Sequence, residues 1–351
     1  MKIDLVRYGL TQRFASPAAE SGFLPGRVLS QGRGIYRVIS ESGEVLARVS
    51  GKFRHDALTS SDYPAVGDFV LLDFSSGAEN GGMIQAVLPR KSVFIRKAGG
   101  TAHEEQVVAA NIDTLFICMA LNLDFNLRRL ERYLAIGWDS GATPVVVLTK
   151  ADLCTDVTGQ MARVRQVAAG ADTLMTSAMA EDGYQQITAY FKEGQTVAFI
   201  GSSGVGKSTL INKLLGEEKL QTKELRNDDK GRHTTTRREL IMLPGGGMVI
   251  DTPGMRELGL WDVTTGIDLS FADVEALALS CRFRDCSHTK EPGCAVLAAV
   301  ESKDLPAQRL ISYRKLKTES AYALDAQGYL AAKERKFKNI AVLSKSMRKK
   351  Q

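Results

Sequence analysis

The sequence predicts a multidomain protein in which a five-stranded β-barrel, a central α/β domain and a C-terminal helical module with a metal site follow one another. Three observations support this prediction. Residues 23 to 93 hold short strand-like runs between turn residues, residues 109 to 262 alternate apolar runs with helix-like stretches, and a cluster of cysteines and histidine begins at Cys281. The chain has 351 residues, which suits two or three domains.

The first predicted domain, residues 23 to 98, is a small β-barrel that follows an N-terminal extension, residues 1 to 22. Its strand-like runs, with no convincing helix between them, are GRVLS, GIYRVIS, EVLARVSG, DFVLLDF and GMIQAVL. Five short strands favour the OB-fold, which commonly binds oligonucleotides, although an SH3-like barrel has nearly the same strand count. The segments GRGIYR and GKFRHD could present basic and aromatic side chains to RNA, or could be solvated strand faces and core aromatics.

The second predicted domain, residues 99 to 265, is a mostly parallel sheet with helices on both faces. Its strand-length runs are continuously apolar, as expected for strands that are buried on both sides. They are TLFICMA, PVVVLT, DTLMTS, TVAFIG and MVIDT, with helix-like stretches such as LRRLERYLAIGWD between them. Ligands of such sheets bind beyond the carboxyl ends of the strands, where the next motifs occur.

The string GSSGVGKS follows the apolar run TVAFI and fits the pattern G-x-x-x-x-G-K-[ST] of a phosphate-binding loop. Its glycines let backbone N–H groups approach phosphate oxygens at the start of the next helix. Lys207 is expected to reach the β- and γ-phosphates, Ser208 to bind Mg²⁺, and Thr209 to lie near the α-phosphate. The expected nucleotide-binding residues of the loop are Gly201, Ser202, Ser203, Gly204, Val205, Gly206, Lys207, Ser208 and Thr209.

The string TKAD, which occurs earlier in the chain, resembles the [NT]-K-x-D motif that holds guanine. A carboxylate at Asp152 can accept hydrogen bonds from N1–H and the N2 amino group of guanine, which adenine does not present together, and Lys150 would lay its stem along the base. TSAM resembles the loop that contacts guanine O6. A more distant alternative is an ATP-dependent enzyme in which TKAD is a coincidence. The expected base-binding residues are Thr149, Lys150, Asp152, Ser177 and Ala178.

Two further motifs follow the phosphate loop. DTPG resembles switch two of GTPases, in which Asp251 would hold Mg²⁺ through water and the Gly254 N–H would contact the γ-phosphate. In KGRHTTTR, Thr236 is the first candidate for the Mg²⁺ ligand of switch one and Thr235 the second. All parts of a P-loop GTPase domain are therefore present, but the base motifs precede the phosphate loop, which is a circularly permuted order.

The chain is similar to a known family, the circularly permuted GTPases, and within it to the GTPases of small ribosomal subunit biogenesis. The resemblance covers nearly the whole chain and rests on the barrel, AANID, TKAD, GSSGVGKST, GRHTTTR, DTPGMRE and the cysteine cluster. It implies a GTPase that binds the maturing small (30S) subunit late in assembly, is stimulated by it and leaves on hydrolysis. GTP, GDP and the rRNA of that subunit are the implied partners.

Met255 follows DTPG, at the position where Ras-type GTPases have a glutamine that orients the attacking water. A thioether cannot replace that amide, so intrinsic hydrolysis should be slow. His233, in the segment of switch one, is the candidate catalytic residue, and the family resemblance implies the same residue; a surface histidine is the alternative. Met255 also leaves open a second function, a GTP-gated RNA-binding scaffold or checkpoint with little turnover.

The third predicted module, residues 266 to 351, contains the string CRFRDCSHTKEPGC. Three thiolates and an imidazole satisfy tetrahedral Zn²⁺ with no open position, so the predicted zinc site is structural. The expected ligands are Cys281, Cys286, His288 and Cys294. Helices are expected from about Pro306, and basic residues that recur in them would meet RNA, with a frayed tail or an anionic membrane surface as alternatives.

Composition and charge favour a folded protein of the cytoplasm. Hydrophobic residues make up 44% of the chain and charged residues 25%, and no stretch reaches the roughly 18 uncharged apolar residues of a membrane span. The start, MKIDLVRYGLTQRF, lacks the apolar run of a signal peptide. Cys118 and Cys154 are interpreted as core or surface thiols. We therefore expect a cytoplasmic monomer with no membrane partner.

Overall fold

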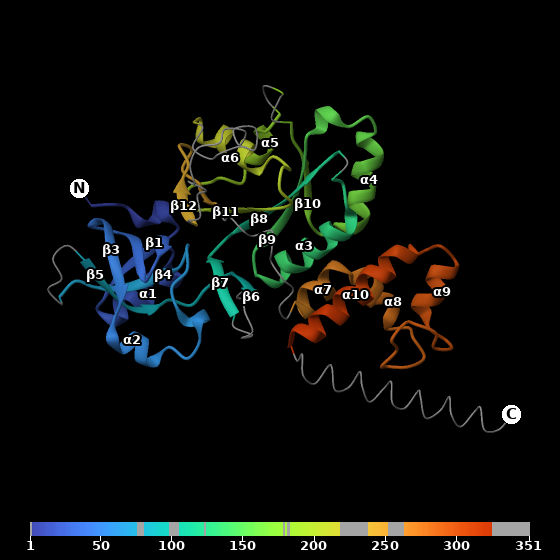
Figure 1. Ribbon diagram of the computed structural model, residues 1–351, viewed down its shortest axis with the longest axis horizontal. Helices are drawn as coiled ribbons and strands as arrows, with labels where there is room; N and C mark the ends of the chain where they lie inside the picture. The colour runs from blue at the N-terminus through green and yellow to red at the C-terminus, as the bar shows by residue number, and fades with distance from the viewer. Residues whose placement is uncertain are drawn as a thin grey trace, which may run out of the picture. The chain divides into compact units, whose positions relative to one another are not determined.

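The structure, a computed structural model, describes residues 2–75, 81–97, 105–122, 124–177, 180, 183–217, 238–251 and 263–324. The chain divides into two compact units, Met1–Gly259 and Leu260–Gln351 (Figure 1). In the first unit, the β-barrel and the α/β domain share one 11-stranded sheet with the order β10-β9-β8-β11-β13-β12-β1-β2-β3-β5-β4. The second unit contains helices and the cysteine cluster.

The N-terminal extension packs on the barrel. It forms a short 3-10 helix, η1 (Leu5–Tyr8), and then α1 (Gln12–Ser21). Phe14 of α1 stacks on Phe69 of the barrel with the ring centroids 4.2 Å apart, and both rings are fully buried. The extension therefore completes a small apolar cluster on the barrel.

The barrel closes on itself, which confirms the predicted OB-fold architecture. Its first strand pairs antiparallel with both the second and the fourth, and its third strand pairs in parallel with the fifth. Val28, Val38, Val70 and Ile84 lie in its core. The strands are β1 (Leu24–Gly32), β2 (Ile35–Ser40), β3 (Gly43–Val49), β4 (Phe69–Asp73) and β5 (Gly81–Val87).

One segment of the barrel differs from the sequence prediction, which expected no convincing helix there. The string GKFRHD forms a short helix, α2 (Gly51–Asp56). Oγ of Ser50 accepts a hydrogen bond from the Phe53 N–H at 3.0 Å, which is the geometry of a helix N-cap. A capping residue next to a short polar run was the signal for this helix.

The α/β domain has helices on both faces of a mostly parallel sheet, as predicted (Figure 1). Ile187 and Leu210 pack with Phe116 on one face, whereas Gly137 packs against Leu115 on the other. The parallel strands are β8 (Thr114–Ala120), β9 (Thr143–Thr149), β10 (Asp172–Met175), β11 (Thr196–Ile200) and β13 (Met248–Asp251). The helices are α3 (Leu127–Asp139), η3 (Ala151–Leu153), α4 (Val157–Val167), α5 (Gln185–Thr188) and α6 (Lys207–Leu215).

A strand that the sequence did not predict joins the barrel to the α/β domain. This strand, β12 (Glu239–Met242), pairs antiparallel with β13 on one side and meets β1 of the barrel on the other, where Ser30 is opposite Glu239. Arg37 of β2 donates a hydrogen bond to Oε1 of Glu239 at 2.8 Å. A separate hairpin, β6 (Val93–Lys97) and β7 (Glu105–Ala110), forms a two-stranded sheet.

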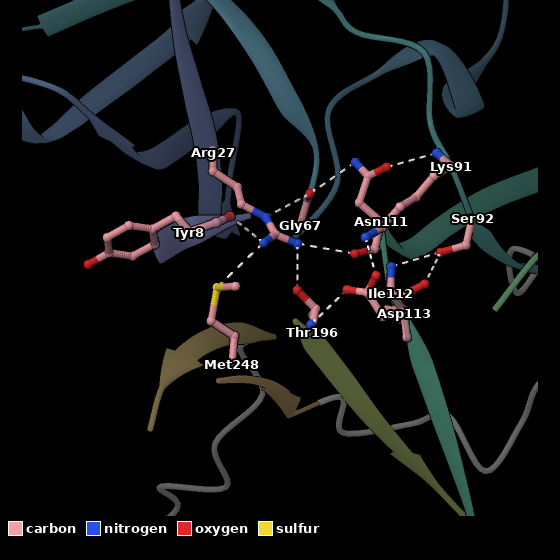
Figure 2. Close-up of polar contacts among 10 residues, drawn as sticks. All are labelled: Tyr8, Arg27, Gly67, Lys91, Ser92, Asn111, Ile112, Asp113, Thr196 and Met248. Carbon is pink, nitrogen blue, oxygen red and sulfur yellow. Dashed lines mark hydrogen bonds and ion pairs between the residues drawn. The ribbon is translucent and has the colours of Figure 1, made fainter. Parts of the chain in front are cut away.

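Arg27 of β1 is buried where the barrel meets the α/β sheet (Figure 2). Burial lowers the pKa of its guanidinium to about 10, against the opposing effect of the nearby carboxylates, so the group is charged at neutral pH. A buried charge is costly unless its polar groups are hydrogen-bonded. The guanidinium donates to the carbonyl oxygens of Tyr8 at 2.5 Å, Gly67 at 3.2 Å and Asn111 at 3.1 Å and to Oγ1 of Thr196 at 2.8 Å.

Gly67 allows this close contact between the domains. Its φ is +91°, and a Cβ at this position would lie 2.2 Å from the carbonyl oxygen of Ala110. Any other residue would push the barrel away from the end of β7. The carboxylate of Asp113 strengthens the same junction, because it accepts hydrogen bonds from Nζ of Lys91 at 2.5 Å and from the N–H of Thr196 at 2.8 Å.

The second unit is a small helical bundle. The guanidinium of Arg309 donates to both carboxylate oxygens of Asp273 at 2.6 and 2.7 Å, and the Tyr313 hydroxyl donates to Glu275 at 2.8 Å. The predicted C-terminal helix is confirmed as far as residue 324; later residues lie outside the described part. The helices are α7 (Thr264–Ser270), α8 (Ala272–Ala278), α9 (Ala295–Glu301) and α10 (Ala307–Leu324). Over the residues placed here, none of the helices has both the length and the apolar character to span a membrane.

Candidate nucleotide site and metal centre

The phosphate loop connects β11 to α6, as the sequence predicts. Gly201 has a φ of +143°, and a Cβ there would lie 2.3 Å from the carbonyl oxygen of Cys118 in the neighbouring strand. Gly206, with a φ of +100°, is the N-cap of α6. The N–H groups of the first helical turn, which begins at Lys207 and includes Ser208 and Thr209, therefore face an anion site.

The side chain of Lys207 lies against the phosphate loop. Its Nζ donates to the carbonyl oxygens of Gly201 and Ser202, both at 2.7 Å. In the adjacent strand, burial raises the pKa of the Cys118 thiol to about 12, so this sulfur is neutral and is not a nucleophile. The positively charged Nζ of Lys207, which lies against the loop, suits a phosphate.

The base motif is bonded to the phosphate loop. The buried hydroxyl of Thr149 donates to the carbonyl oxygen of Val205 at 2.5 Å, although 56 positions separate these residues. Lys150 follows with a φ of +56°, which turns the chain into η3 and places Asp152 on the surface. The two motifs that stand far apart in the sequence therefore lie side by side.

The second base loop meets the first through a side-chain hydrogen bond. Oγ of Ser177 donates to Oδ1 of Asp152 at 2.5 Å. The backbone adds a further link, because the Ala151 N–H donates to the carbonyl oxygen of Thr176 at 3.2 Å. One oxygen of the Asp152 carboxylate is thus held by the protein, and the arrangement can orient the group toward the two donors of a guanine edge.

The remaining predicted positions of the nucleotide site are only partly described. Asp251 ends β13, which is parallel to β11, so its backbone lies at the same edge of the sheet as the phosphate loop. Its side chain is not described. The other predicted residues that lie outside the described part are Ala178, His233, Thr235, Thr236, Gly254 and Met255.

The contacts within this site were not predicted. Among them, the bond between Thr149 and Val205 joins the base motif to the phosphate loop, and another bond joins Ser202 to Asp124, which follows β8. A polar residue after an apolar strand was the available signal for Asp124, because the carboxyl ends of neighbouring parallel strands meet at one edge.

The second unit holds a candidate metal centre. The four predicted ligands, which come together from one loop and the start of α9, have their ligand atoms within 4.8 Å of one another. Cys294 is the N-cap of α9, where its sulfur accepts a hydrogen bond from the Leu297 N–H at 3.4 Å. Thiolates and an imidazole suit a metal ion with tetrahedral coordination. The residues of the centre are Cys281, Cys286, His288 and Cys294.

The loop between His288 and Cys294 is shaped by a carboxylate. Glu291 accepts hydrogen bonds from the N–H groups of Ser287 at 3.2 Å, Thr289 at 2.8 Å and Lys290 at 3.0 Å. The Ser287 hydroxyl also donates to this carboxylate, and that hydrogen bond, followed by those from the N–H groups of Thr289 and Lys290, lowers the pKa of Glu291. The ligand loop is therefore held in a turn by its own polar contacts.

The fold and the site together define a class of protein, a P-loop GTPase whose motifs are circularly permuted. A family model described as RsgA GTPase matches residues 87–261. A protein of Lactiplantibacillus plantarum named small ribosomal subunit biogenesis GTPase RsgA 2 is 52% identical over 324 residues, which cover 92% of this chain and 91% of that protein. The chain belongs to the RsgA family of GTP hydrolases.

Further comparisons agree with this assignment. The RsgA protein of Opitutus terrae is 48% identical over 88% of this chain and 86% of its own length. The crystal structure of YjeQ from Thermotoga maritima matches with a TM-score of 0.62 and 27% identity over 85% of this chain and 98% of that one. The crystal structure of YloQ, titled a circularly permuted GTPase, matches with a TM-score of 0.58 and 26% identity over 85% of this chain and 95% of that one. A model described as 50S ribosome-binding GTPase matches residues 196–336.

Proposed function

We propose that this GTPase binds the small ribosomal subunit during late maturation and that hydrolysis of GTP, stimulated by the subunit, drives its release. The observation that carries the proposal is the Asp152–Ser177 contact, which brings the two predicted guanine motifs together, in a chain whose relatives are named for biogenesis of that subunit. The description that names the 50S subunit belongs to a match over residues 196–336 only. The relatives that match over most of the chain favour the small subunit.

The roles in nucleotide binding follow from the positions of the residues. Asp152 would accept the two hydrogen bonds of the guanine edge, Lys150 would cover the base, and Lys207 would move from the loop carbonyls to the β- and γ-phosphates. Ser208, Thr236 and Asp251 would hold Mg²⁺, which neutralises phosphate charge when it is bound. Backbone N–H groups of the loop, and of Ala178 and Gly254, would complete the contacts.

His233 is the proposed catalytic residue, because Met255 offers no group that can orient a water molecule. The His233→Ala variant should bind GTP as the wild type does but should lose subunit-stimulated turnover. Stimulated turnover at the wild-type rate would remove His233 from the mechanism.

We infer that the metal of the second unit is zinc with a structural role. A tetrahedral Zn²⁺ with Zn–S bonds of about 2.3 Å places two sulfur ligands about 3.8 Å apart. The sulfur atoms of Cys281 and Cys294 lie 3.8 Å apart, and Nδ1 of His288 lies 3.4 Å from Sγ of Cys294. These spacings support four protein ligands, which leaves no position for substrate.

The proposed rRNA contacts involve the barrel and the second unit. The OB architecture commonly binds oligonucleotides, and α2 presents Lys52, Arg54 and His55, which are exposed. Arg282 and Arg284, beside the metal centre, add exposed positive charge. A factor of this kind would act as a monomer in the cytoplasm, where ribosomal subunits mature.

Co-sedimentation with small and large ribosomal subunits tests the proposal. The chain should pellet with small subunits in a non-hydrolysable GTP analogue and should be released in GDP, while large subunits should retain little of it. Single-turnover hydrolysis should accelerate when small subunits are added. Binding to small subunits that is the same in GDP and in the GTP analogue would contradict the proposed cycle. A rate of hydrolysis that does not change when small subunits are added would contradict it as well.

A further inference from the structure

The loop after β8 places a carboxylate beside the phosphate loop. Oδ2 of Asp124 accepts a hydrogen bond from Oγ of Ser202 at 2.5 Å, although 78 positions separate the two residues. Oδ1 of the same carboxylate lies 2.8 Å from Nη2 of Arg129, which also donates to the Asp124 carbonyl oxygen. Asp124 therefore connects the phosphate loop to the first turn of α3.

Ser202 has a second contact that matters for nucleotide binding. Its carbonyl oxygen accepts a hydrogen bond from Nζ of Lys207 at 2.7 Å. If Lys207 moves to the phosphates, as proposed above, this carbonyl oxygen would lose that donor. The hydroxyl of Ser202 then remains tied to Asp124, so the loop can keep its shape while the lysine moves.

We propose that Asp124 is a positioning residue of the nucleotide site: it holds Ser202 so that the phosphate loop keeps the conformation that binds GTP and GDP. Arg129 orients this carboxylate and balances its charge. The balance matters because an unpaired carboxylate near the phosphates would repel them. The inference deepens the proposed function and rests on it for the identity of the ligand.

The exposure of the pair separates this role from a merely structural one. The side chains of Arg129 and Asp124 are 30% and 36% exposed. Partly exposed ion pairs contribute little to the stability of a fold. Loss of the Asp124 carboxylate should therefore lower the affinity for nucleotide without lowering the stability of the fold.

A double-mutant cycle on the full-length chain tests the contact between Asp124 and Ser202. The variants are Asp124→Ala, Ser202→Ala and the double variant, and the measurements are the Kd of a fluorescent GDP and its dissociation rate. Each single change should raise the Kd about five- to tenfold, the size expected for one hydrogen bond. The double variant should be no weaker than the worse single variant.

Two results would overturn the inference, one from this cycle and one from denaturant unfolding of the same variants. One is a double variant whose loss equals the product of the two single losses, because the residues would then act independently. The other is a parallel drop in the denaturant midpoint of the nucleotide-free protein. Asp172→Ala is the matched control: it removes a carboxylate–hydroxyl bond to Tyr190 of 2.8 Å at the start of β10, and it should leave the GDP affinity unchanged.

The charge balance has its own test. Arg129→Met leaves the negative charge of the Asp124 carboxylate without its ion-pair partner. The variant should therefore bind a non-hydrolysable GTP analogue less tightly, and its affinity for GDP should fall by a smaller factor, because the triphosphate carries more negative charge. Adding Asp124→Asn to that variant should restore the ratio of the two affinities, since an amide keeps an acceptor for Ser202 without the charge. An unchanged ratio in Arg129→Met would overturn the role of Arg129.

The wild-type measurement distinguishes this inference from the proposed function. A wild-type chain that binds no guanine nucleotide would contradict the proposed function itself. A wild-type chain that binds GDP normally, with an Asp124→Ala variant of equal affinity, would overturn the positioning role alone.

Discussion

The guanidinium of Arg27 donates a hydrogen bond to Oγ1 of Thr196 at 2.8 Å, so a barrel residue holds the first residue of the strand that ends in the phosphate loop. The same guanidinium lies 3.4 Å from Sδ of Met248, the first residue of the strand that ends at Asp251. The barrel is therefore bonded to the amino ends of β11 and β13, two of the strands whose carboxyl ends carry nucleotide motifs. Arg27 is the centre of that junction (Figure 2).

Replacing Arg27 with Met should lower the free energy of unfolding by at least about 3 kcal/mol, because several buried oxygens would lose their donor. Arg37→Met is the matched control. Arg37 also joins the barrel to the sheet, through Glu239, but its side chain is 39% exposed. Its loss should cost at most about 1 kcal/mol. Denaturant unfolding of the two variants gives the comparison, and equal losses would contradict the special role of the buried group.

Changing Asp152 to Asn should reduce affinity for GTP and GDP about 10- to 100-fold, because an amide cannot accept both hydrogen bonds of the guanine edge. The preference for GTP over ATP should fall in parallel. The control is Asp156→Asn, the same change at the N-cap of α4, where asparagine caps as well as aspartate. Titration with fluorescent GDP, competed by GTP or ATP, measures both effects. Unaltered GTP preference in the Asp152 variant would exclude this carboxylate from base recognition.

Changing Thr149 to Val should loosen the contact between the base motif and the phosphate loop. The variant keeps the shape of the buried side chain but leaves the Val205 carbonyl oxygen without its donor, which costs about 1–3 kcal/mol. Faster release of GDP and a lower unfolding midpoint are both expected. Thr143→Val, at the exposed start of the same strand, should change neither quantity. Stopped-flow dissociation and thermal unfolding provide the readouts.

Removing the metal should unfold the ligand loop and α9 but leave the rest of the helical bundle intact. Cys286→Ala should abolish stoichiometric metal binding and expose residues 281 to 301 to hydrogen exchange, because α9 begins at the ligand Cys294. α10 should keep its protection, since Arg309 and Asp273 hold it without the metal. GDP binding should be normal, as it should be in the control Cys154→Ala. Rapid exchange throughout α10 would show that the metal holds the whole bundle.

The sequence predicted most strands and helices because their signals are local. The apolar run TLFICMA became β8, and LRRLERYLAIGWD became α3. β12 was missed because it has only four residues and begins with Glu239, so its identity as a strand comes from pairing with β13 and the barrel. The helix α2 was missed because its six residues include one large apolar side chain, that of Phe53, and therefore show no apolar periodicity.

By itself, the sequence determined which chemical groups this protein has for a guanine nucleotide and for a metal, and in what chain order, because such motifs are short and depend on residue type and spacing. Only the tertiary structure decided which distant residues meet. Arg27 and Thr196 are 169 positions apart, and Asp124 and Ser202 are 78 apart. Such contacts follow from the order in which strands pair in the sheet, and a local pattern of residues does not contain that order.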